Sequence, residues 1–193
     1  MSLTKYAVET FISKKIIEVT ECNAIDIYAE FPSAKEWLSG FGLMIIFVNQ
    51  PREEIRPFAL QFLRRIETAF SEYSLAREDL QHLVSGDRGR WSPYYRALYH
   101  FEAALGQLYQ AYDYSRKMLD SKLFESNDGS PLDRLNKIHN TSKHQLAVEE
   151  QPVWVTNDGI ESNDIKITFG EVEDLLRSCG RIAMKLSQNV ALS

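Results

Sequence analysis

The chain has 193 residues, with 22 Lys and Arg against 27 Asp and Glu, which gives a formal net charge of −5. This balance excludes a general nucleic-acid coat, because such proteins bind by neutralising phosphates with an excess of cations, although it leaves room for a local basic site. A hydrophobic content of 44% and a charged content of 25% are typical of a globular protein. The length suits one domain with a substantial core.

The sequence shows no sign of secretion or of a membrane span. Its first residues lack the apolar core and the cleavage site of a signal peptide, and the longest apolar run, residues 41–48, is far shorter than the roughly 18 residues of a span. Cys22 and Cys179 form no disulfide framework, and Cys179 lies on an apolar helical face, which predicts a buried, reduced thiol. We therefore expect a cytoplasmic protein that does not contact a membrane.

The first quarter of the chain predicts two helices around an ambiguous segment. Residues 3–19 repeat apolar side chains at helical spacing. Residues 24–33 fit either an extended or a helical conformation. Ser33 is placed to cap a second helix that reaches Val48. The glycines of that helix also allow a strand over residues 43–48, but we favour a buried helix.

A long helical hairpin is predicted for the centre of the chain. Pro51 or Pro57 opens a helix that runs to about Val84, with apolar residues in steps of three and four. Helices of this length usually pack lengthwise on a partner of similar length. A second helix over residues 92–121, reached through a loop at residues 85–90, is the obvious partner.

This second hairpin helix is unusually apolar. Ser92 is its expected N-cap and Pro93 its first helical residue. Apolar and aromatic side chains cover roughly half of its circumference, so it should contact neighbours on two sides. Glu102 interrupts the aromatic arc beside Tyr95 and Tyr99. A carboxylate there needs a cationic or hydrogen-bonding partner, or it stays protonated.

The last third of the chain combines two helices with a short β segment. Ser130 caps a helix that begins at Pro131 and runs to about Leu146. Residues 152–169 alternate and turn like a β-hairpin or two short strands, and residues 168–171 match a capping box that opens the last helix. We predict a mainly α fold over residues 1–193, an up-and-down helical bundle with a long antiparallel helical hairpin and a small β-hairpin before the C-terminal helix.

Residues 133–144 gather basic and polar side chains on an acidic chain. The Arg134-x4-His139 pair resembles the R-x4–6-H motif of HEPN domains, and the order of helices is similar too. The N-x-S-K-H ending at residues 140–144 also looks like one found in HEPN-like bundles. The resemblance implies a homodimer that cleaves RNA without metal, with the His as acid/base at the 2′-hydroxyl and the Arg on the phosphate. Leu135 stands where those domains usually have a polar residue.

Helical geometry separates the two motif residues. At about 100° per residue, Arg134 and His139 lie about 140° apart, so they could face one phosphate only across a dimer. Asn136 and Lys143 flank His139, whereas His144 points the other way. We therefore count His139, Asn136 and Lys143 as the better-clustered set.

Structural roles compete with functional ones at each of these positions. His139 lies on an apolar stripe and fits a core histidine, and Arg134 fits an ion pair with neighbouring turns. Lys143 and His144 are favoured near a helix C-terminus by the helix dipole alone. Glu102 is a candidate carboxylate partner for His139 or Lys143, or a member of a structural network.

Three functions fit the sequence, and none calls for a metal or a cofactor, because no Glu-x-x-His repeat, phosphate-binding loop or dinucleotide motif occurs. The favoured one is a non-catalytic HEPN-like binding or interaction module of a prokaryotic-type system, homodimeric, with RNA or a nucleotide as candidate partner. The second is a metal-independent endoribonuclease that uses Arg134 and His139. The third is a small-ligand pocket inside the bundle. Its expected lining is Tyr95, Tyr99, Glu102 and His139.

Overall fold

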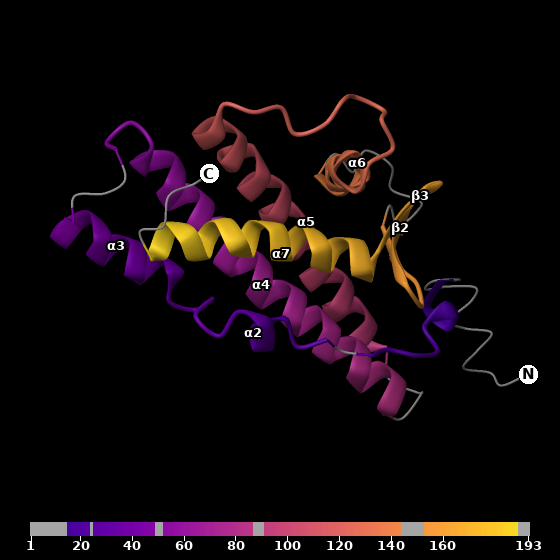
Figure 1. The fold of residues 1–193 in the computed structure, drawn as a ribbon. Helices are drawn as coiled ribbons and strands as arrows, with labels where there is room; N and C mark the ends of the chain where they lie inside the picture. Colours follow the sequence, from indigo (N-terminus) through magenta and orange to yellow (C-terminus); the bar gives the residue numbers. More distant parts are fainter. Residues whose placement is uncertain (1–14, 24, 49–51, 87–90, 144–152, 189–193) are drawn as a thin grey trace, which may run out of the picture.

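The structure is a computed structural model that describes residues 15–23, 25–48, 52–86, 91–143 and 153–188 (Figure 1). These residues form a short 3-10 helix, a set of α-helices and one three-stranded antiparallel sheet. In chain order the elements are η1 (Lys15–Glu18), α2 (Ile27–Glu30), α3 (Trp37–Val48), α4 (Arg56–Ser85), α5 (Ser92–Leu119), α6 (Pro131–Lys143), β1 (Trp154–Val155), β2 (Gly159–Ser162), β3 (Ile165–Thr168) and α7 (Phe169–Ser187). The mainly helical fold with a small β element before the last helix is as predicted.

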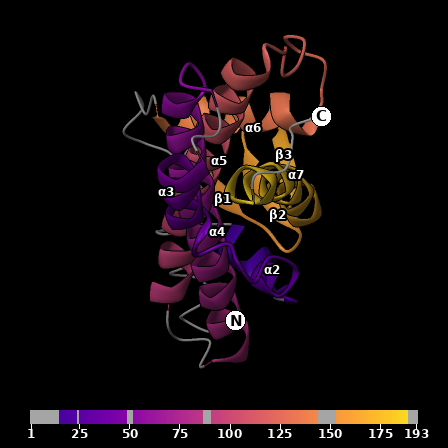
Figure 2. The same cartoon turned by 60° about the vertical axis from the view of Figure 1, so that its left-hand side comes forward.

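The hairpin of α4 and α5 forms the centre of the molecule, and both views show the two helices side by side (Figures 1 and 2). Each helix carries an apolar stripe in steps of three and four, and the stripes face each other, which removes them from water. α4 has Pro57 in its first turn, so the second of the two candidate prolines opens it. The largest fully buried side chains of the pair are Phe62, Leu63, Ile66, Phe70, Tyr73, Leu80, Tyr94, Phe101 and Leu105.

The start of α5 differs from the prediction. Ser92 is already helical, and the N-cap position belongs to Trp91, whose side chain makes no capping hydrogen bond. Pro93 lies in the first turn, where its missing N–H needs no acceptor. At the other end Asp120 adopts a left-handed conformation, with φ of 47°, and donates its N–H to the Arg116 carbonyl.

α7 lies across the hairpin, and α3 packs beside its C-terminal half (Figure 1). A close approach requires Gly180 in α7, because a Cβ there would lie 2.9 Å from Cε1 of the Phe31 ring. Phe31 in turn packs edge-to-face with Trp37 and Phe70. Cys179 is a free, fully buried cysteine, and burial raises the pKa of its thiol to about 12. The predicted burial of this thiol is confirmed.

α3 is a helix, so the alternative of a strand over residues 43–48 is wrong. The prediction that this helix is buried holds only for its first half. Trp37 and Phe41 are fully buried, whereas Ile46 is 72% and Phe47 79% exposed. The apolar composition could not show this, because a helix that is apolar all round gives no sign of which face meets the core. Ser33 precedes the helix by a turn and does not cap it.

The sheet is built as two successive antiparallel pairs, β1 with β2 and β2 with β3. It confirms the predicted β segment and adds a middle strand, whose short sequence carries little periodic signal. The Val155 N–H donates to the Tyr94 hydroxyl at 3.2 Å, which ties the sheet to α5. At the end of β3, Thr168 and Glu171 form the predicted capping box of α7.

Several predictions fall at the edge of the described residues. Of the helix expected over 3–19, residues 1–14 lie outside them, and η1 is a 3-10 helix. The ambiguous segment 24–33 contains the short helix α2, whose N-cap is the side chain of Asp26. α6 is described to Lys143, and its expected continuation lies outside the described residues. None of the described helices combines the length and apolar character that crossing a membrane requires.

Candidate functional site

α6 carries the polar residues singled out above, and its first turn is built around Asp133. The Ser130 hydroxyl accepts the Asp133 N–H at 3.2 Å, which confirms Ser130 as a cap. The nearly fully buried Asp133 carboxylate accepts the N–H groups of Asn127 and Gly129 and lies 2.7 Å from the Lys137 ammonium. The hydrogen bond from Lys137 is the main reason that the pKa of Asp133 lies below its usual value.

Arg134 is tied to α7. Its guanidinium donates to the Glu171 carboxylate, and both side chains are about 30% exposed. The other oxygen of Glu171 accepts the Thr168 N–H at 2.9 Å, so one carboxylate completes the capping box and holds α6. Burial alone would raise the pKa of Glu171, but the hydrogen bonds from Thr168 and the nearby Arg134 charge lower it overall.

His139 lies between α6 and α5. Its ring packs on Gly106, where a Cβ would come within 3.3 Å of Cε1 and Nδ1, and it stands 5.4 Å from the Tyr109 ring centre. Arg134 therefore faces α7 while His139 faces α5. The angular separation read from the sequence agrees with this placement. The structure does not bring the two motif residues together within one chain.

Glu102 contacts α6 one helical turn away from the contact between Gly106 and the His139 ring. The Ser142 hydroxyl donates to its carboxylate at 3.1 Å. Burial raises the pKa of Glu102, and the Ser142 hydrogen bond offsets part of that rise. The carboxylate thus has the hydrogen-bonding partner that its position requires, and this partner is Ser142. Pairing of Glu102 with His139 or Lys143 stays a prediction. The Lys143 side chain lies outside the described residues.

The other predicted binding residues are spread over the surface. The Asn136 side-chain oxygen accepts from Asn140 at 3.1 Å on the same helix. Tyr95 is 38% and Tyr99 67% exposed, so neither lines an enclosed pocket inside the bundle, and a role of either at an interface stays a prediction. His144 lies outside the described residues.

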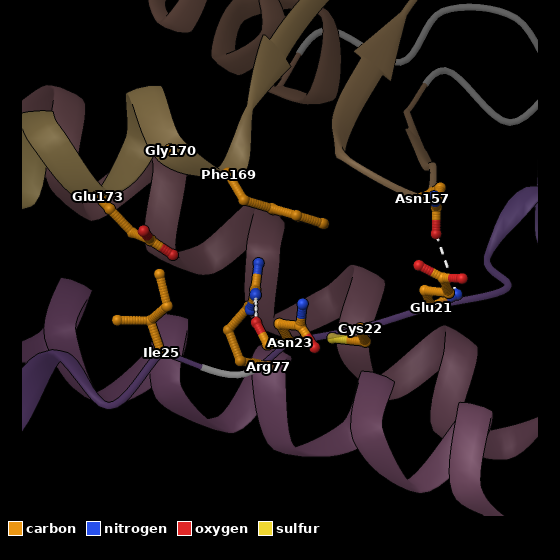
Figure 3. A pocket seen from close by; sticks show the side chains of 9 residues that line it. All are labelled: Glu21, Cys22, Asn23, Ile25, Arg77, Asn157, Phe169, Gly170 and Glu173. Carbon is orange, nitrogen blue, oxygen red and sulfur yellow. Dashed lines mark hydrogen bonds between the residues drawn. The ribbon is translucent and has the colours of Figure 1, made fainter.

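A pocket of about 280 Å3 opens elsewhere, where the segment before α2 passes between α4 and the start of α7 (Figure 3). Sequence reasoning missed it. The available signal was Arg77, a cation within the apolar stripe of α4, four residues after Tyr73 and three before Leu80. The described lining is Glu21, Cys22, Asn23, Ile25, Arg77, Asn157, Phe169, Gly170 and Glu173.

Comparisons with protein-family models, with curated proteins and with solved structures give no significant match. Within the part of the chain that the structure describes, no group of three or more His, Cys, Asp or Glu side chains is arranged to hold a metal ion. The geometry of α6 and of the pocket therefore carries the chemical information on this chain.

Proposed function

We propose that this chain is a non-catalytic binding module with a HEPN-like layout, in which Arg134 and His139 hold α6 in place. The observation that supports this most is the pairing of Arg134 with Glu171. The guanidinium that would stabilise a phosphate is occupied by a carboxylate of the same chain, at a capping box that also fixes the start of α7.

The position of His139 supports the same reading. An acid/base group must come within hydrogen-bond reach of the atom whose proton it moves. The His139 ring is packed against Gly106 and Tyr109 on the α5 side, opposite Arg134. A phosphate held by Arg134 would therefore lie across the helix from the His139 ring, and the net charge of −5 adds no general attraction for RNA.

The test is an RNA cleavage assay in the presence of EDTA, with labelled single-stranded RNA. We expect no cleavage by the wild-type protein above that of His139→Ala. His100→Ala is the matched control, since His100 lies in the α4–α5 hairpin with its Nδ1 2.6 Å from Glu72 Oε2. Cleavage that survives EDTA, disappears in His139→Ala and persists in His100→Ala would overturn the proposal in favour of the endoribonuclease.

A further inference from the structure

The pocket between the N-terminal segment, α4 and α7 contains an unusual cation. Arg77 rises from α4 into it (Figure 3) and is only 5% exposed. Its Nη2 donates to the Asn23 carbonyl, whereas Nε and Nη1 are buried without a hydrogen-bond partner among the described residues. Arg65 and Arg134 each leave one buried nitrogen unpartnered, but Arg77 leaves two, and it alone of these three lines this cavity.

A buried guanidinium with two unpartnered nitrogens destabilises the folded chain unless another group or a ligand accepts their hydrogen bonds. A guanidinium stays protonated at all ordinary pH values, and a buried charge needs hydrogen-bonding or ionic partners. The neighbours of Arg77 compensate only part of the cost of burying its charge. The guanidinium carbon lies 4.3 Å from the centre of the Phe169 ring, a cation–π contact that leaves the in-plane N–H donors unfilled.

Of the two acidic residues in the described lining, Glu21 is exposed, and the buried Glu173 is engaged elsewhere. The Glu173 carboxylate accepts from the Tyr73 hydroxyl at 2.6 Å and lies 3.8 Å from the Arg177 guanidinium. Burial raises the pKa of the Cys22 thiol, so Cys22 is neutral near pH 7 and supplies no anion. Among the described residues Arg77 has no ion pair. The open Arg77 donors could therefore take an external anion as their partner.

The position of α7 favours the same ligand. The helix begins at Phe169, and its second residue, Gly170, lines the pocket. The first turn of this 19-residue helix therefore borders the cavity that holds Arg77, although its Phe169 N–H is donated to the Asp158 carbonyl and its Glu171 N–H to the Thr168 hydroxyl. The buried cation with open donors is what selects for negative charge here, and the dipole of α7 adds to it.

We propose that this pocket binds a small organic monocarboxylate, with its carboxylate on Arg77 at the start of α7 and its apolar part toward Phe169 and Ile25. The cavity of about 280 Å3 has room for a small organic molecule. Glu21 and Glu173 line the same pocket, so a doubly charged phosphate would meet more repulsion than a single carboxylate. Ile25, 44% exposed at the pocket, offers apolar surface that phosphate would not use.

The inference goes beyond the binding role proposed above, because it names a ligand class and a site to which α6 contributes no lining residue. Carboxylate binding and RNA cleavage are therefore separate outcomes. If no carboxylate binds, the pocket inference fails and the proposed function stands. If RNA is cleaved in EDTA, the proposed function fails and the pocket inference stands.

The test is isothermal titration of the full chain with acetate, butyrate and benzoate at constant ionic strength. Each carboxylate has its neutral amide as a control, and inorganic phosphate is the competing anion. We expect binding that increases from acetate to benzoate, no binding of the amides, and phosphate about tenfold or more weaker. Equal binding of benzoate and benzamide, tighter binding of phosphate, or no binding of any carboxylate at about 10 mM would overturn the proposal.

Two pairs of variants, each a test variant with its control, locate the site. Arg77→Gln should abolish benzoate binding, while Arg65→Gln, on the same helix but outside the pocket, should leave it unchanged. Because Arg77→Gln removes a buried contact and could unfold the chain, the partly exposed Ile25 supplies an independent test. Ile25→Asp should weaken benzoate binding about tenfold by charge repulsion, while its isosteric control Ile25→Asn should weaken it less. Equal affinities of Ile25→Asp and Ile25→Asn would also contradict the site.

Discussion

Single side chains at the α5–α6 contact decide how closely the two helices approach. Glu102 and Gly106 lie one turn apart on α5, and they meet Ser142 and His139 of α6. Glu102 is a titratable group that is partly buried at this contact. At Gly106 the absence of a side chain leaves room for the His139 ring. Each leads to a prediction about a single substitution.

Glu102→Gln should remove a pH-dependent loss of stability. Burial raises the pKa of Glu102 in the folded state above the ordinary value of 4.5. The folded protein therefore favours the protonated acid, and its stability falls as pH rises from below 4.5 through the raised pKa. Glutamine cannot ionise but still accepts from Ser142. Urea unfolding from pH 4 to pH 8 should show wild type losing stability relative to Glu102→Gln as pH rises; parallel curves would contradict this.

Gly106→Ala should stabilise α5 less than the same change stabilises α3. Alanine in a helix interior is favoured over glycine by about 1 kcal/mol. At Gly42 a Cβ meets nothing within 4 Å, so Gly42→Ala should realise most of that gain. At Gly106 the Cβ lies 3.3 Å from two atoms of the His139 ring, so the ring must yield. In a His139→Ala background the two alanine substitutions should become alike, as measured by urea unfolding.

At the scale of elements, α3 and the α6–α7 junction show what packing adds to local pattern. α3 carries no charged residue from Trp37 to Val48, yet only its first half meets the core. α6 is tied to α7 by an arginine that reaches the capping box of that helix, in addition to its contacts with α5.

The orientation of α3 can be tested with two phenylalanines of the same helix. Phe41 is fully buried and Phe47 is 79% exposed. Phe41→Ala should lower the free energy of unfolding by about 3–5 kcal/mol, because it leaves a cavity in the core. Phe47→Ala should change it by about 0.5 kcal/mol or less. Similar losses at both positions in chemical denaturation would show that the second half of α3 is covered.

The α6–α7 tie separates into a cap and an ion pair. Glu171→Gln keeps a side chain able to complete the capping box but removes the charge that Arg134 meets. It should cost about 1 kcal/mol or less, since both side chains are about 30% exposed and the pair is screened. Glu171→Ala should cost about 1–2 kcal/mol through the lost cap. In an Arg134→Met background the glutamine change should become nearly neutral while the alanine change keeps its cost.

For the whole molecule, the sequence predicts periodic elements well and individual contacts poorly. The hairpin of α4 and α5, the Ser130 cap and the Thr168–Glu171 box follow from spacing and local chemistry, which the sequence shows directly. Tyr99 and Phe47 are exposed because of which neighbours cover a helix, and that depends on tertiary packing. The Arg77 pocket brings Asn23, Phe169 and Asn157 together across the chain. The sequence signal for this pocket is a single cation, Arg77, within the apolar stripe of α4.

The last prediction concerns two chains together. The HEPN resemblance predicts a homodimer, so light scattering should give twice the mass of one chain. If a nuclease site formed across that dimer, Arg134→Ala and His139→Ala would each be inactive, but a mixture refolded together would regain one composite site per heterodimer. Arg134 is bound to Glu171 and His139 is packed on Gly106. We therefore expect no EDTA-resistant RNA cleavage from the mixture. Recovery of cleavage on mixing would show that the motif acts between chains and that its role in holding α6 is secondary.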